Sequence, residues 1–131
     1  MAVALRVRDE TPTGREVGEF VIPEIDEHCT LRDLIRTRVR DEVARYNAAP
    51  QPVFHGLVQP TDAEARLNGY HLKVARLLDW EEQAAVAERA FAHNGFFVLV
   101  DGQQIVSLDD DVTLTPDTQV AFVRLVPLVG G

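Results

Sequence analysis

Residues 96–106 read FFVLVDGQQIV and contain the strongest fold signal in the chain. The continuous apolar and aromatic run over residues 96–100 is typical of a central β-strand. Asp101-Gly102 follows directly, and Asp-Gly between two apolar runs is the strongest short-range sign of a hairpin. We therefore predict a strand over 96–100 and a second strand, over 103–106, that folds back on it.

The last predicted strand runs from Gln119 to about Leu125 and is apolar on both faces. Side chains alternate between the two faces of a strand, so Val120 and Phe122 share one face, and the other carries Ala121, Val123 and Leu125. We expect the first face to lie toward the main helix. The second face is then either a docking surface for a partner, as exposed apolar patches often are, or ordinary core covered by the inserted helices.

The N-terminal segment predicts a second hairpin. Val3, Leu5 and Val7 alternate with less apolar residues, which is the pattern of a half-buried strand. Residues 11–14, TPTG, predict a turn. A strand over 17–22 follows, and we expect it to stop at Pro23, which cannot donate a ladder hydrogen bond.

Two segments carry helix signals. Thr30 and Asp33 form a near capping box at the start of the first, whose apolar positions are Leu31, Leu34, Ile35, Val39, Val43 and Tyr46. The acidic pair Asp79 and Glu82 starts the second, and Asn94-Gly95 ends it. Its apolar positions are Trp80, Ala84, Ala87 and Phe91.

Residues 50–94 read as an insertion that is largely helical. Thr61 with Glu64 predicts the cap of a short helix that Asn68-Gly69 would end. A second helical stripe is predicted over 70–78, from Tyr70, Val74, Leu77 and Leu78, although an irregular packed excursion fits the same residues. The whole chain, 1–131, is then a single α+β domain in which a mixed sheet packs on one main helix. Because the first and last strands can pair in parallel through the long crossover, this is the outline of a β-grasp fold.

The C-terminal third resembles a known family. Residues 97–104 (FVLVDGQQ), 118–122 (TQVAF) and 127–131 (PLVGG) are similar to the ubiquitin-like β-grasp sulfur carriers, the MoaD/ThiS family of molybdopterin synthase small subunits and thiamine-biosynthesis carriers. The specific features are the final strand and the terminal Gly-Gly. The resemblance covers about two-thirds of the chain, because residues 50–94 have no counterpart in the small family members.

This resemblance implies a function for the C-terminus. A partner E1-like (ThiF/MoeB-type) adenylyltransferase would consume ATP to activate the Gly131 carboxylate, for thiocarboxylate sulfur transfer or for protein conjugation, and a sulfur donor or an E2-like or acceptor protein would follow. Gly130 lacks a Cβ and lets the backbone enter a narrow passage. Candidate docking residues for the partner enzyme are Val123, Leu125, Pro127, Leu128 and Val129, and Lys73, the only lysine, is the candidate conjugation site. The alternative is a non-covalent β-grasp interaction module with an inert tail.

Composition limits the remaining functions. The chain has 131 residues, with 13 basic and 21 acidic side chains and a net charge of −8, which disfavours nucleic acid and anionic membranes as partners. The single cysteine, Cys29, has no internal partner, and the N-terminus lacks a signal-peptide core, so we expect a cytoplasmic protein. The four histidines lack metal-ligand spacing, and no catalytic constellation or phosphate-binding loop is evident. We therefore expect a carrier with no bound cofactor rather than an enzyme.

Overall fold

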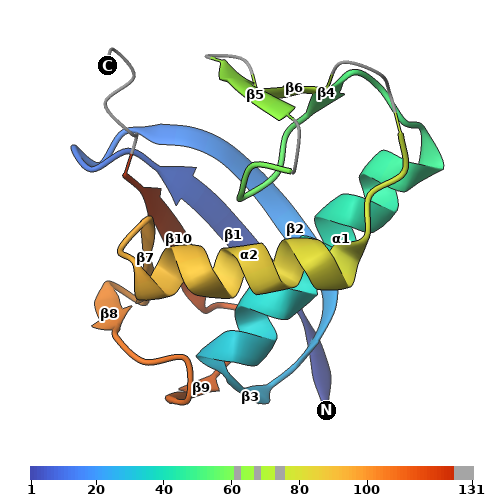
Figure 1. The fold of residues 1–131 in the computed structure, drawn as a ribbon. Coiled ribbons are helices and arrows are strands. Elements are labelled where there is room, and N and C mark those ends of the chain that lie inside the picture. The colour runs from blue at the N-terminus through green and yellow to red at the C-terminus, as the bar shows by residue number, and fades with distance from the viewer. Residues whose placement is uncertain (61–62, 67–68, 73–75, 126–131) are drawn as a thin grey trace. The chain divides into compact units, whose positions relative to one another are not determined.

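The computed structural model describes residues 1–60, 63–66, 69–72 and 76–125, which form an α+β structure with a mixed sheet and two helices. They fall into two compact units, residues 1–34 with the residues from 90 on, and residues 35–89. Figure 1 labels the helices, α1 (Leu31–Ala48) and α2 (Trp80–Ala92). The strands are β1 (Ala2–Glu10), β2 (Glu16–Asp26), β3 (His28–Thr30), β4 (Val53–Phe54), β5 (Ala63–Arg66), β6 (Gly69–Leu72), β7 (Phe96–Val100), β8 (Gln103–Ile105), β9 (Asp111–Thr113) and β10 (Gln119–Arg124).

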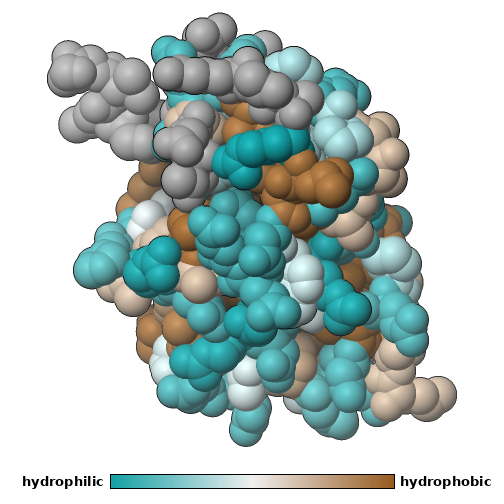
Figure 2. Space-filling view, turned by 45° about the vertical axis from the view of Figure 1, so that its right-hand side comes forward, coloured by the Kyte–Doolittle hydropathy of each residue, from teal (hydrophilic) through white to brown (hydrophobic). Residues whose placement is uncertain are grey.

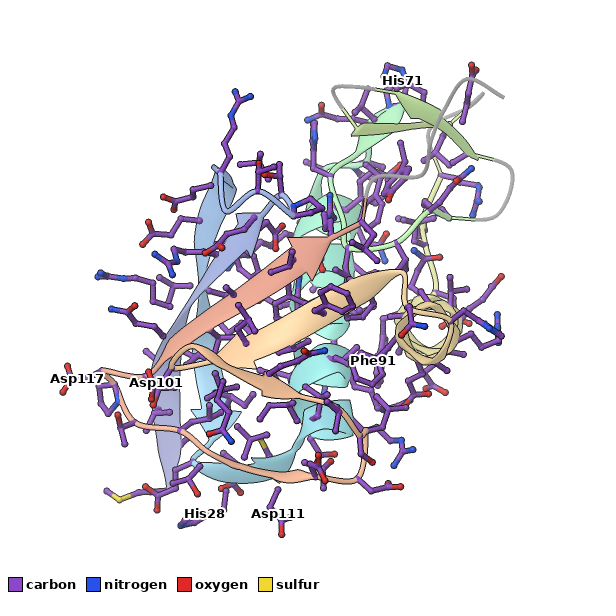
Figure 3. The ribbon with its side chains drawn as sticks, turned by 90° about the vertical axis from the view of Figure 1, so that its left-hand side faces the viewer. His28, His71, Phe91, Asp101, Asp111 and Asp117 are labelled. Carbon is purple, nitrogen blue, oxygen red and sulfur yellow. The ribbon has the colours of Figure 1, made fainter. Side chains whose placement is uncertain are left out.

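Five strands of the first unit form one mixed sheet in the order β2-β1-β10-β7-β8. Strands β1 and β10 are neighbours and run parallel, with Val7 opposite Val120. The other neighbours are antiparallel, and Figure 3 shows β10 beside β7. The predicted parallel pairing of the first and last strands is therefore confirmed.

The hairpin predicted at Asp101-Gly102 is confirmed. Val100 pairs with Gln103, so only the two turn residues separate β7 from β8. Both have positive φ, 48° at Asp101 and 80° at Gly102, as a type I′ turn requires. The Asp101 carboxylate also accepts a hydrogen bond from the Gln119 backbone N–H (2.9 Å), which ties the turn to the start of β10.

Strand β2 does not stop at Pro23, so the predicted end of this strand is wrong. It continues to Asp26, and the ladder shifts register there, with Ile22 opposite Leu5 but Ile25 opposite Val3. Two β2 residues thus face one residue of β1, which is a bulge. Proline is tolerated at a bulge on the outermost strand of a sheet, because no ladder N–H is needed from it.

The short pair β3 and β9 was not predicted from the sequence. Cys29 lies opposite Val112 in this antiparallel pair. The first two backbone N–H groups of α1, from Leu31 and Arg32, donate to the carbonyls of Asp110 and Leu108. The loop before β9 therefore satisfies the donors that every helix leaves unpaired at its N-terminus.

The start of α1 follows the predicted capping box. The Thr30 hydroxyl accepts a hydrogen bond from the Asp33 N–H (3.2 Å), and the Asp33 carboxylate accepts one from the Thr30 N–H (3.1 Å). These reciprocal bonds pair two further N-terminal donors. All six predicted apolar positions of this helix are buried, and they are Leu31, Leu34, Ile35, Val39, Val43 and Tyr46.

The second unit contains a three-stranded antiparallel sheet where helices were predicted. Residues 63–66 form β5 and residues 69–72 form β6, in the order β4-β6-β5, so both predicted helices between 61 and 78 are wrong. Thr61 and Val74, on which these predictions also relied, lie outside the described residues. Gly69, at φ 132°, begins β6 and pairs with Arg66 of β5, so it lies in an antiparallel strand pair rather than at a helix end.

Side chains from α1 fix the connections of the second unit. The Tyr46 ring packs edge-on against Phe54 at 5.3 Å between centroids, and its hydroxyl donates to the Gln51 carbonyl (2.6 Å). The Asn47 amide accepts from the Leu78 N–H (2.9 Å) and donates to the Leu78 carbonyl (2.8 Å). These bonds hold the chain on both sides of the small sheet.

Helix α2 begins and ends where the sequence predicts. The Asp79 carboxylate accepts a hydrogen bond from the Glu81 N–H (3.0 Å), as an N-cap does. At the other end, Asn94 has φ 60° and the Gly95 N–H donates to the Ala90 carbonyl (2.7 Å). Neither described helix is long and apolar enough to cross a membrane.

Candidate functional site

The base of the C-terminal segment lies in the middle of the five-stranded sheet. Strand β10 is flanked by β1 on one side and β7 on the other. The last described residue, Leu125, donates its backbone N–H to the Gly95 carbonyl (3.2 Å). The backbone before residues 126–131 is therefore paired with both neighbours up to Val123 and remains hydrogen-bonded on the β7 side as far as Leu125.

An aromatic cluster anchors this end of β10. Phe122 is fully buried, and its ring lies 5.8 Å from that of Phe96. The Phe96 ring in turn lies 5.8 Å from that of Phe91, which Figure 3 labels. Burial of aromatic rings contributes strongly to stability, so the end of β10 is held in place by packing in the hydrophobic core.

Most of the site residues predicted at the tail lie outside the described residues. These are Gly130, Gly131, Pro127, Leu128 and Val129, and the candidate conjugation residue Lys73 lies outside them as well. Val123 and Leu125 are the predicted docking residues that the structure describes.

The second face of β10 is not an exposed apolar patch. Ala121 is 4% and Val123 is 9% exposed, and Leu125 is half-buried. The expectation of an open docking face is therefore corrected at Ala121 and Val123, whose burial fits the alternative of ordinary core. Residues buried this far offer a partner little apolar area to cover.

Large exposed apolar side chains lie elsewhere and apart in the sequence. Among the described residues they are Met1, Val17, Val21, Leu77 and Val106. Hydrophilic residues cover most of the face shown in Figure 2, and hydrophobic residues appear on it in several small groups. Scattered apolar residues of this kind are normal on a protein surface and do not by themselves mark an interface.

A polar hollow of about 340 Å³ lies at the opposite end of β10. It is lined by Arg6, Arg8, Glu16, Glu19 and residues 116–120. Asp117, at this end of the strand, is labelled in Figure 3. Arg6 is paired with Glu19 (3.3 Å) and Arg8 with Glu10 (3.2 Å), so acidic neighbours already neutralise both guanidinium groups. The lining has no thiol or imidazole that could act as a nucleophile or base.

The histidines do not gather into a metal site. Within the described parts of the chain, no group of three or more His, Cys, Asp or Glu side chains could hold a metal ion. Figure 3 labels His28 and His71, which lie in β3 and β6. The single free thiol, Cys29, is half-buried in β3.

Cys29 is placed to be unreactive. Its burial, together with the nearby carboxylates of Asp33 and Asp26, raises the pKa of this thiol from 9.0 to about 11. All three effects disfavour the thiolate, which is the nucleophilic form of cysteine. Cys29 is therefore poorly suited to form a thioester or to carry sulfur.

Iodoacetamide tests this arrangement. At pH 8 we expect Cys29 of the folded protein to react roughly 100-fold more slowly than in the guanidinium-unfolded chain, because the higher pKa leaves far less thiolate. The unfolded thiol also loses its proton first, so stability should fall as pH rises from 9.0 through about 11. A Cys29→Ser variant should lack this component of the decline. Equal alkylation rates in the folded and unfolded chains would contradict the expectation.

Two arrangements of charged side chains were not predicted. Arg38 is 2% exposed and its Nε donates to the Glu42 carboxylate (3.0 Å), although a helical arginine normally lies at the surface. Arg36 and Arg40 lie with their guanidinium carbons 5.2 Å and 5.4 Å from the centre of the Trp80 ring. The four-residue spacing of these arginines was visible in the sequence, but their contact with Trp80 depends on tertiary structure.

No family model, curated protein or solved structure matches this chain.

Proposed function

We propose that this protein is a ubiquitin-like β-grasp carrier or modifier whose Gly131 carboxylate is activated by an E1-like adenylating enzyme. The observation that carries the proposal is the position of β10, next to β1 and immediately before residues 126–131. The mixed sheet supports it, because the N-terminal hairpin and the C-terminal strand meet in one sheet with β7 and β8 on the far side. The terminal Gly-Gly sequence supplies the unhindered carboxylate that such chemistry needs.

The chemistry takes place in the partner enzyme. A Gly131 carboxylate oxygen attacks the α-phosphorus of ATP, pyrophosphate leaves, and an acyl-adenylate results. A persulfide sulfur of the donor, or an amine of an acceptor protein, then attacks the carbonyl carbon and AMP leaves. The amine yields an amide directly, whereas the persulfide yields an acyl disulfide that a thiol reduces to the thiocarboxylate. Because the protein supplies only the carboxylate, it needs no catalytic side chain of its own.

A fixed strand end favours this use of the C-terminus. Phe122 and the hydrogen bond from Leu125 to Gly95 hold the base of the tail, so little conformational entropy remains to be lost there on binding. Residues 126–131 contain Pro127 and two glycines and no charge except that of the terminal carboxylate. Of the two predicted docking residues that the structure describes, Val123 is buried and Leu125 is half-buried, so we expect recognition to rely mainly on residues 126–131 themselves.

The test is mass analysis of the full chain, tagged at its N-terminus and recovered from its native host. We expect either the mass increase of one oxygen replaced by sulfur or discrete higher-mass conjugates on denaturing gels. Both should disappear when Gly131 is deleted and persist in a Gln103→Ala control, which alters an exposed residue of β8. A Lys73→Arg variant should remove only species in which one copy is linked to the lysine of another.

The alternative of a non-covalent interaction module would give a different result. Only the unmodified mass would then appear, even when an adenylating enzyme from the same host and ATP are supplied. The Gly131 deletion would also leave non-covalent binding of the partner intact. That outcome would overturn the carrier proposal.

A further inference from the structure

A basic and aromatic surface lies within the second unit. We call it the Arg36–Arg40–Trp80 surface, after the residues that form it. Both guanidinium groups lie within cation–π distance of the indole, at 5.2 Å and 5.4 Å from its centre. Arg36 is one-third exposed, Arg40 is exposed, and Trp80 is half-buried, so the cluster is accessible to solvent.

The charges of these two arginines are poorly compensated. The other arginines of α1 have close carboxylates, since Arg38 pairs with Glu42 and Arg45 with Asp41 (2.9 Å), and Arg32 pairs with Asp109. Within the described ranges, the only carboxylate near Arg36 is that of Glu88, at a long distance of 3.9 Å. Arg40 has no carboxylate within ion-pair distance among the residues that the structure describes.

This arrangement is unusual in so acidic a chain. Like charges one helical turn apart disfavour a helix. With 21 acidic residues against 13 basic ones, a basic group can readily find an acidic neighbour, as Arg6 and Arg8 do. A pair of poorly compensated arginines held beside the only tryptophan therefore has the composition of a binding hot spot, where Trp and Arg are enriched.

We propose that the Arg36–Arg40–Trp80 surface binds an acidic peptide segment of a partner protein. Each guanidinium group can donate two parallel hydrogen bonds to a Glu or Asp carboxylate, and the indole provides apolar area beside them. A short segment reaches both arginines without extending over the acidic remainder of the surface. A nucleic-acid strand carries its charge along its whole length, so the net charge of −8 opposes it more strongly.

The site goes beyond the proposed carrier function and does not require it. All its residues belong to the second unit, whereas the tail follows β10 in the first. Deleting Gly131 should leave binding of the acidic segment unchanged. The two proposals can therefore fail independently.

Trp80 gives a local signal for the test, because it is the only tryptophan. The full chain is titrated at low salt with an acetylated hexaglutamate peptide, following Trp80 fluorescence and, in parallel, the anisotropy of a dye-labelled peptide. Hexaglutamine serves as the neutral peptide, and a six-residue oligothymidylate represents nucleic acid. We expect saturable binding of hexaglutamate that weakens as salt screens the charges.

Two charge-matched double variants decide where the peptide binds. Arg36→Gln with Arg40→Gln should weaken binding at least about tenfold, a loss of ~1.4 kcal/mol. Arg6→Gln with Arg15→Gln changes the net charge equally, on exposed residues of the first unit, and should leave affinity within about twofold. Equal losses in both variants, equal binding of hexaglutamine, or preference for oligothymidylate would overturn the proposal.

Discussion

Replacing Phe122 by alanine should lower the free energy of unfolding by about 3–5 kcal/mol. Phe122 is fully buried, contacts the Phe96 ring and lies opposite Val98 on the neighbouring strand. Its removal leaves a cavity in the middle strand of the five-stranded sheet, where the surrounding backbone can relax little. Urea unfolding followed by far-ultraviolet circular dichroism measures the change.

An exposed apolar residue provides the control for that experiment. Val106 is 72% exposed and follows β8, so Val106→Ala should change stability by no more than about 0.5 kcal/mol. A loss below 1 kcal/mol for Phe122→Ala would mean that the packing around β10 is looser than its burial indicates. The base of the C-terminal tail would then be less firmly fixed than the burial of Phe122 implies.

Replacing Arg38 by methionine should cost about 3–5 kcal/mol, because it leaves the Glu42 carboxylate in a poorly solvated position without this cation. The Arg38 side chain is 2% and that of Glu42 12% exposed, and they are joined at 3.0 Å. Changing both residues to methionine removes the charge along with its partner. The double variant should therefore recover most of the stability that the single variant loses.

Helix α1 offers a matched pair for comparison. Arg45 and Asp41 have the same four-residue spacing, but the Arg45 side chain is 55% exposed. Arg45→Met should therefore change the free energy of unfolding by only about 0.3–0.5 kcal/mol. Similar losses in the free energy of unfolding for Arg38→Met and Arg45→Met would show that burial does not determine how much the Arg38–Glu42 pair contributes to stability.

The sequence predicts most accurately those elements whose signals are local. The Asp-Gly hairpin and the Thr30–Asp33 capping box each depend on side chains that bond within a few residues, and both have the expected geometry. The buried positions of α1 follow from helical periodicity alone. Parallel pairing of β1 with β10 could also be predicted, because the order of elements leaves few ways to close the sheet.

The wrong predictions occur where a local sequence signal is compatible with two structures, or where residues far away in the sequence determine the structure. Asn68-Gly69 is consistent with a helix end or a hairpin turn, and pairing with β4 favours the hairpin. Proline ends most strands but is accepted at the bulge in β2. The burial of Val123 and of Arg38 depends on residues far away in the sequence, which periodicity cannot reveal. For the candidate site, the sequence predicts the tail but not the packing of the strand before it.

The central place of β10 has a consequence for how the protein folds during synthesis. The ribosome makes β1 and β2 before the other strands of this sheet, yet the strand that joins them to β7 is the last of the five to leave it. Until then, β1 lacks one of its two neighbours and exposes an unpaired edge of the kind that promotes aggregation. The long sequence separation between β1 and β10 also favours slow closure of the sheet. A polypeptide released before Arg124 would lack part of its middle strand, so we expect an unfolded product rather than a shortened domain.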